Sequence, residues 1–116
     1  MMAKLMGLKT ISPSMLQENL QTGGMSVFDV NSPQSWSQAH VPGAKRLDPE
    51  AFTPSDLPTD KAATLVFYCS NPMCRKAPNA AKRAKAMGWT NVLVMDAGIT
   101  GWTNASLPTE SLDDGH

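Results

Sequence analysis

Short continuous apolar runs alternate along this chain with longer stretches in which apolar residues have helical spacing. The clearest apolar run, residues 63–68, shows no alternation with polar residues. Both of its faces should therefore be covered, as for a strand in the middle of a parallel sheet. A second buried strand is predicted over 91–95, a third over 27–30, and a weak fourth around 9–11.

Helical segments separate these strands. Ser12 and Ser32 are each followed by proline, the pattern of an N-cap and a first helical residue, so a helix should begin after each serine, the second covering 34–39. Within 77–87, alanines and a methionine recur at the spacing i, i+3, i+4, i+7. This spacing predicts a helix with a nearly all-alanine face that can lie close to the sheet. A last helix is predicted over 98–104.

Strands that alternate with helices predict right-handed crossover connections. The expected fold is therefore an α/β domain with a central parallel sheet of about four to five strands and helices on both faces. The 116 residues suit one domain. We predict an N-terminal arm at 1–10, the domain at 11–105 and a polar C-terminal tail at 106–116. Three prolines within 49–60 predict a loop with at most one helical turn.

Charge and composition narrow the function. Ten basic residues balance ten acidic ones, so the overall charge does not favour nucleic acid or an anionic membrane as a partner. No apolar run approaches the roughly 20 residues needed to cross a bilayer. We therefore predict a cytoplasmic location. Two histidines, His40 and His116, and two cysteines do not supply the usual spacing of a four-ligand zinc site, so no metal or other cofactor is expected.

Cys69 is the candidate nucleophile. It follows the best predicted strand and directly precedes a helix, at the sheet edge where open α/β sheets bind ligands. The amides of the short polar segment 70–75 can turn inward as an anion nest, and the helix adds its positive N-terminal end. Arg75 could reach back to an oxyanion from the far end of the loop. These effects favour the thiolate of Cys69 over its thiol.

The predicted site contains more than the cysteine. Its members are catalytic Cys69, substrate-binding Ser70, Asn71, Met73, Cys74 and Arg75, and supporting Asp29 and Lys76. Asp29 should support the loop by hydrogen bonding rather than act as an acid.

Each feature also has a structural explanation. A buried structural cysteine is the alternative for Cys69, although such a residue would more naturally lie within a strand. Cys74 is either a resolving partner, which forms a disulfide or accepts a persulfide, or a loop residue whose geometry forbids that bond. His40 is assigned to turn architecture. The tryptophans, Trp36, Trp89 and Trp102, are assigned to packing.

The order of several segments resembles the rhodanese family. They are 27–30 (VFDV), 40–44 (HVPGA), 66–69 (VFYC), 80–81 (AA), 88–92 (GWTNV) and 98–102 (GITGW). This resemblance implies that Cys69 takes sulfane sulfur as a persulfide while the loop amides hold a small anionic donor, thiosulfate or a persulfide. The acceptor would be a thiol, cyanide or a protein. A monomer or weak dimer is expected, with no nucleic-acid or membrane partner.

The chain departs from the family pattern in three ways. Asn31 replaces the usual arginine, Pro72 replaces a loop glycine, and the loop is longer, with the Cys-x5-Arg spacing of cysteine phosphatases. A wider loop could hold phosphate or arsenate, so a phosphatase or arsenate reductase is the alternative enzyme. Phosphatases usually carry histidine where Tyr68 stands, and no acid for the leaving group is identifiable. An inert rhodanese-like recognition module is the alternative without catalysis, although such modules usually lack the cysteine.

Overall fold

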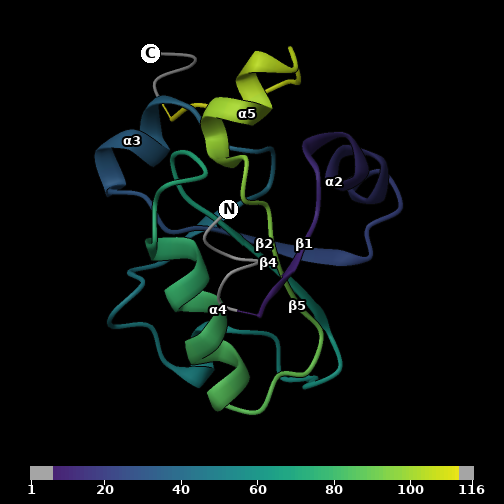
Figure 1. Cartoon of the computed structure of the whole chain (residues 1–116), viewed down its shortest axis with the longest axis vertical. Helices are drawn as coiled ribbons and strands as arrows, with labels where there is room; N and C mark the ends of the chain where they lie inside the picture. The colour runs from purple at the N-terminus through teal and green to yellow at the C-terminus, as the bar shows by residue number, and fades with distance from the viewer. Residues whose placement is uncertain (1–6, 113–116) are drawn as a thin grey trace.

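The computed structural model describes residues 7–112, and its centre is one parallel sheet (Figure 1). The five strands are β1 (Lys9–Thr10), β2 (Met25–Asp29), β3 (Lys45–Arg46), β4 (Thr64–Tyr68) and β5 (Val92–Val94). They are ordered β1-β5-β4-β2-β3, and each neighbouring pair is parallel. The predicted α/β fold is therefore confirmed, with β4 in the middle of the sheet as its unbroken apolar run indicated.

Four α-helices and one 3-10 turn connect the strands. They are α2 (Pro13–Leu20), α3 (Pro33–Gln38), the 3-10 helix Pro54–Asp56, α4 (Lys76–Ala86) and α5 (Gly98–Asn104). Ser12 and Ser32 cap α2 and α3 as predicted, since each side chain accepts a hydrogen bond from an N–H in the first turn. The single turn within 49–60 is confirmed as well.

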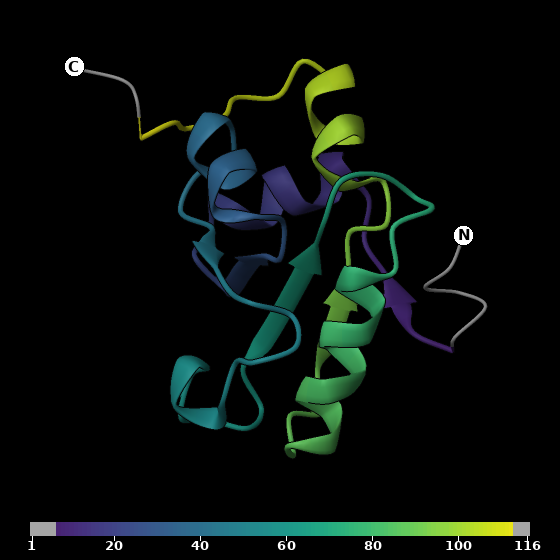
Figure 2. The same cartoon turned by 90° about the vertical axis from the view of Figure 1, so that its left-hand side faces the viewer.

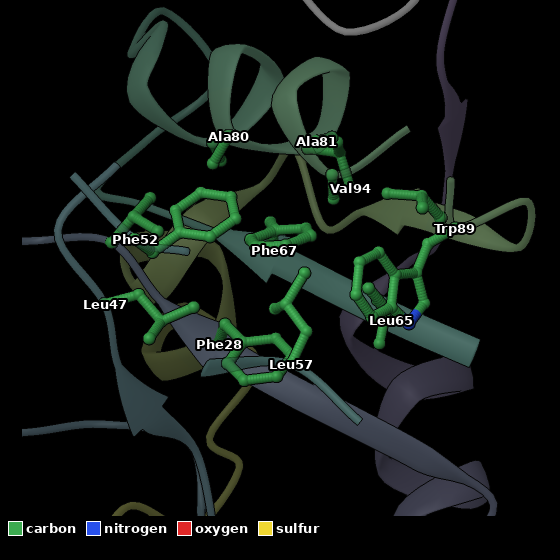
Figure 3. Packing of buried hydrophobic residues seen from close by; sticks show 14 of the residues in the cluster. Phe28, Leu47, Phe52, Leu57, Leu65, Phe67, Ala80, Ala81, Trp89 and Val94 are labelled. Atoms are coloured by element: carbon green, nitrogen blue, oxygen red, sulfur yellow. The ribbon is translucent and has the colours of Figure 1, made fainter. Parts of the chain in front are cut away.

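Helices cover both faces of the sheet. On one face, the alanines of α4 pack against β4 and β5, with Ala80 above the rings of Phe52 and Phe67 and Ala81 beside Val94 (Figure 3). The rings of Phe28 and Phe67 stack at 5.4 Å between centroids. On the opposite face, Leu16 of α2 and Trp102 of α5 belong to a second buried cluster. The small side chains of α4 let its backbone lie close to the sheet, which places its N-terminus beside the end of β4.

The sequence prediction missed strand β3. Its two residues carry no apolar run, and Lys45 is exposed. The strand forms at the sheet edge because it pairs with the end of β2, followed by a hydrogen bond from the Leu47 N–H to the Asp29 carbonyl at 3.0 Å. This pairing brings Arg46 beside the residues that follow β2.

The segment after α5, predicted as a polar tail, is held against the domain up to residue 112. His40 and Glu110 form an antiparallel bridge with backbone hydrogen bonds of 3.0 and 2.9 Å. The Trp102 indole donates to the Pro108 carbonyl at 2.7 Å. His40 stacks on Trp36 with 4.4 Å between ring centroids, in the turn region to which it was assigned. Most of the predicted arm and the end of the tail, 1–6 and 113–116, lie outside the described residues, so the three boundaries stay predictions.

No helix within the described residues has both the length and the apolar composition needed to span a membrane.

Candidate functional site

Cys69 directly follows the central strand β4 and is 2% exposed. Its carbonyl accepts a hydrogen bond from the Ile99 N–H at 2.9 Å, and the carbonyl of Ser70 accepts one from Thr100 at 3.0 Å. The loop between β4 and α4 therefore lies beside the start of α5 (Figure 2). Cys69 thus lies at the sheet edge where ligands bind in this class of fold, with α4 beginning a few residues later.

Asn71 folds the loop back on itself. Its side-chain Oδ1 accepts a hydrogen bond from the Met73 N–H at 2.9 Å, and its carbonyl accepts one from the Cys74 N–H at 3.1 Å. This turn brings Cys74 against the core cluster that contains Cys69, and the two side chains interact. Both cysteines are free thiols in the structure.

A chain of hydrogen bonds links the loop to β2. The Ser70 hydroxyl donates to Asn31 Oδ1 at 2.9 Å, and the Asn31 N–H donates to Asp29 Oδ1 at 2.8 Å. Arg46 Nε donates to the Asn31 carbonyl at 3.0 Å. Asn31, noted in the sequence as a departure from the family pattern, therefore bridges β2 and the cysteine loop, with an arginine from β3 beside it.

Asp29 is completely buried. Burial raises the pKa of its carboxyl above the ordinary value of 3.8, while the Tyr68 hydroxyl and the hydrogen bonds from Asn31 act in the opposite direction. The Tyr68 hydroxyl also accepts a hydrogen bond from the Val41 N–H at 3.0 Å. The Asp29 carboxyl is thus connected through Tyr68 to the end of β4 and to the 41–44 turn, and through Asn31 to the start of the cysteine loop.

The two thiols differ in acidity. Burial raises the pKa of Cys69 to about 12, and the Cys74 sulfur beside it adds to that shift, whereas backbone N–H groups of Ala77 and Ser70 lower it in part. Burial also raises the pKa of Cys74, but the Cys69 thiol and the backbone N–H and charge of Lys76 outweigh that effect and leave it below 9.0. The surroundings therefore favour the thiol form of Cys69 and the thiolate form of Cys74.

Two effects that the sequence did not reveal oppose the predicted Cys69 thiolate. That prediction rested on the loop amides and the helix N-terminus, and amides do act on the Cys69 sulfur. Burial of Cys69 and the adjacent Cys74 sulfur raise the pKa of Cys69 by more than the amides lower it. Neither the burial nor the contact with Cys74 can be predicted from sequence spacing.

The remaining predicted residues lie on the outer side of the loop. Met73 is 72% exposed, and Asn71 and Arg75 are exposed. Within residues 7–112, the Arg75 guanidinium makes no hydrogen bond or ion pair, and its predicted role as an anion ligand stays a prediction. Lys76 begins α4 and lines a hollow of about 300 Å³ with Asn31 and Arg46.

Gly98 is a site residue whose role the sequence did not reveal. Its φ is +69°, and a Cβ there would come within 2.5 Å of the Ser70 carbonyl group and 2.6 Å of the Asn71 nitrogen. Only glycine lets α5 approach the loop this closely. The sequence analysis noted Gly98 within the Gly-Ile-Thr-Gly-Trp segment, but the spacing of that segment does not predict a contact with the cysteine loop.

Two further features of the described residues bear on what the site can hold. Among residues 7–112, no three histidine, cysteine, aspartate or glutamate side chains gather in a way that could hold a metal ion. A second hollow of about 710 Å³ lies between α2 and the 3-10 helix, lined among others by Leu20, Met25 and Leu57. None of its lining residues belongs to the cysteine loop, so it is separate from the candidate site.

Comparisons with known proteins agree with this architecture. Residues 12–105 match the family described as Rhodanese-like domain. The thiosulfate sulfurtransferase GlpE of Ectopseudomonas mendocina is 30% identical over 103 residues, which cover 89% of this chain and 91% of that protein. The uncharacterized protein slr1261 of Synechocystis is 29% identical over 100 residues, or 86% of this chain, and this match spans 55% of the length of slr1261.

A solved structure shows the same fold. The BH2092 protein from Bacillus halodurans superimposes with a TM-score of 0.81 over 96% of this chain and 81% of its own, at 22% sequence identity. At that identity the likeness concerns the arrangement of helices and strands.

Proposed function

Because this chain belongs to the rhodanese-like domain family, we propose that it is a sulfurtransferase that carries sulfane sulfur as a persulfide on Cys69. The Cys69 thiolate attacks the sulfane sulfur of thiosulfate, the S–S bond of the donor breaks, and sulfite leaves. A thiol, cyanide or a protein thiol then attacks the outer sulfur of the persulfide and releases the Cys69 thiolate.

The observation that carries this proposal is the position of Cys69 among backbone donors. The sulfur lies at the end of the central strand, and the N–H groups of Ala77 and Ser70 act on it. Donors fixed by the fold stabilise negative charge without reorganising during the reaction. They support both a thiolate and an anionic persulfide at this atom.

The two thiols provide a route to the Cys69 thiolate. Two thiolates in contact repel each other, so one proton is shared between Cys69 and Cys74 after the first has been lost. Transfer of that proton from Cys69 to Cys74 gives the attacking thiolate without moving charge out of the loop. Cys74 is therefore assigned to the machinery of this proposal.

Lys76 begins the helix after the loop, and its positive charge supports a small anionic donor. The hollow that Lys76 lines together with Arg46 also contains the acidic residues Asp48 and Glu50, so its basic and acidic residues balance. Of the predicted loop ligands, Ser70 and Asn71 would contribute their backbone N–H groups to donor binding. The side chains of Met73 and Arg75 are exposed to solvent. The cytoplasmic location and the monomeric or weakly dimeric state remain predictions.

The test is production of thiocyanate from thiosulfate and cyanide. We expect turnover by the unaltered chain, background rates for Cys69→Ser, and unchanged turnover for Lys82→Ala, an exposed position of α4 away from the loop. Equal activity of Cys69→Ser would remove Cys69 from the mechanism. Hydrolysis of an aryl phosphate without any thiocyanate would instead favour the phosphatase alternative.

A further inference from the structure

We propose that Cys74 resolves the Cys69 persulfide by attacking Sγ of Cys69, which forms an intramolecular Cys69–Cys74 disulfide and releases hydrosulfide. This inference rests on the proposed function, because the persulfide is its starting material. The reaction with Cys74 would let the protein release its bound sulfur when no acceptor is present.

The shape of the loop brings the two sulfurs together. Both backbone and side chain of Asn71 accept hydrogen bonds from the residues that follow it, so the chain reverses within 71–74. Cys74 then packs against the buried cluster that contains Cys69, and the two thiol side chains interact. The contact is therefore a property of the folded loop as well as of the short spacing in sequence.

The contact also selects which sulfur of the persulfide is attacked. The Cys74 side chain interacts with the Cys69 thiol, whose Sγ becomes the inner sulfur once a sulfane sulfur has been added. Attack there gives a disulfide. Attack on the outer sulfur would instead move the persulfide to Cys74 and free the Cys69 thiolate, and the two outcomes differ in mass and in released sulfide.

Cys74 is suited to be the attacking group. It is only partly buried, and the backbone N–H and charge of Lys76, which remain when Cys69 carries a persulfide, lower its pKa and favour its thiolate. An attacking thiol within the same loop also acts at high effective concentration. A free thiol in solution has to reach Cys69, which is 2% exposed.

The step balances without an outside oxidant. The bond between Sγ of Cys69 and the sulfane sulfur breaks, and the sulfane sulfur leaves as hydrosulfide with both electrons of that bond. The Cys74 thiolate supplies the electron pair of the new disulfide, so the Cys74 sulfur is oxidised, the sulfane sulfur is reduced, and Sγ of Cys69 keeps the oxidation level it had in the persulfide. A low-molecular-weight thiol or a dithiol protein is then needed to restore the two thiols.

The experiment uses the full chain, reduced and desalted without oxygen, and incubated with thiosulfate but no acceptor at mildly alkaline pH. Intact mass under denaturing conditions and trapped sulfide are followed together. We expect the unaltered chain to lose about 2 Da with release of one equivalent of sulfide. Cys74→Ser should keep a gain of about 32 Da, with loss of that sulfur slower by about tenfold or more.

Two controls separate the inference from the proposed function. Lys82→Ala, on the exposed side of α4, touches neither sulfur and should form the disulfide as the unaltered chain does; incubation without donor should leave both thiols reduced. A stable gain of about 32 Da in both the unaltered chain and Cys74→Ser would overturn the resolving role and leave the sulfurtransferase proposal standing. Transfer of the persulfide to Cys74 without sulfide release would also overturn it. No gain of sulfur in any variant would contradict the proposed function itself.

Discussion

The backbone N–H of Ile99 donates to the carbonyl of Cys69 at 2.9 Å, so the start of α5 holds the strand end that carries the proposed nucleophile. One residue later, Thr100 and Ser70 repeat the contact. The two backbones can approach this closely because Gly98, just before them, has no side chain and adopts a positive φ. The geometry of the cysteine loop is thus partly set by a helix that follows it by more than twenty residues in the sequence.

Gly98→Ala should therefore destabilise the fold and displace the loop. The added Cβ would meet the Ser70 carbonyl group at 2.5 Å, where backbone must move. We expect a loss of about 2–4 kcal/mol in the free energy of unfolding, measured in denaturant. Gly43→Ala is the matched control, because Gly43 has φ +80° with nothing within 4 Å, and it should cost only about 1–2 kcal/mol. Equal losses in the two variants would contradict the role of the close approach.

Ala80→Leu should test the close packing of α4 on the sheet. Ala80 is completely buried over Phe67 and Phe52 (Figure 3), so a larger side chain has no space without moving the helix. We expect the free energy of unfolding to fall by about 1–3 kcal/mol. Lys82→Leu, on the exposed side of the same helix, should leave it within about 0.5 kcal/mol. A stable Ala80→Leu variant would mean that the interface is loosely packed.

Most of the fold was predictable because its signals are local. The run at 63–68, the serine-proline starts and the alanine spacing each reflect the burial or capping of a single element. Strand β3 was not predictable, since Lys45 and Arg46 become a strand only by pairing with β2. The signal for such a strand lies in a partner distant in sequence rather than in its own residues.

The candidate site likewise has features that the sequence predicts and features that it does not. The place of Cys69 at a strand end followed from the order of the elements. The ionisation of the thiol pair did not, because it depends on how deeply Cys69 is buried and on the turn at Asn71 that brings Cys74 against it. The bridge from Asn31 to Ser70 was equally hidden, since it joins residues that are 39 positions apart.

Asp29→Asn should alter how stability depends on pH. The pKa of Asp29 is raised by burial, so the folded chain holds its proton more tightly than the unfolded chain. This contribution to stability is present below pH 3.8 and is lost as the pH rises through the higher folded value. The difference in unfolding free energy between the unaltered chain and Asp29→Asn should therefore shrink from acidic to neutral pH. Denaturant titrations of both proteins test this, and a constant difference would show that Asp29 titrates normally.

The hydrogen bond between Ser70 and Asn31 should give a measurable coupling energy. Its length is 2.9 Å and it is partly buried, so we expect about 0.5–1.5 kcal/mol from a double-mutant cycle of Ser70→Ala and Asn31→Ala in denaturant unfolding. In the thiocyanate assay, both single variants should raise the KM for thiosulfate because the loop loses its tie to β2. Additive effects on unfolding would show that the two side chains do not support each other.

Removing one thiol of the pair should shift the pKa of the other, and the two shifts should have opposite signs. Besides burial, the Cys74 sulfur helps to raise the pKa of Cys69 to about 12, so the pKa of Cys69 should fall in Cys74→Ser. The Cys69 thiol helps to lower the pKa of Cys74, so the pKa of Cys74 should rise in Cys69→Ser. Rates of alkylation by iodoacetamide across pH measure both values, with peptide mapping to assign the modified sulfur.

In the unaltered chain, the same experiment should label Cys74 first, because it ionises first and is the more exposed of the two sulfurs. Lys76→Ala removes the nearby positive charge that helps to lower the pKa of Cys74, and should move its titration to higher pH. Lys82→Ala, further along the same helix, should leave the titration unchanged. If each single-cysteine variant instead titrated near pH 8.5 like a free thiol, the sulfurs would be independent of each other, and the proton transfer within the pair would lose its basis.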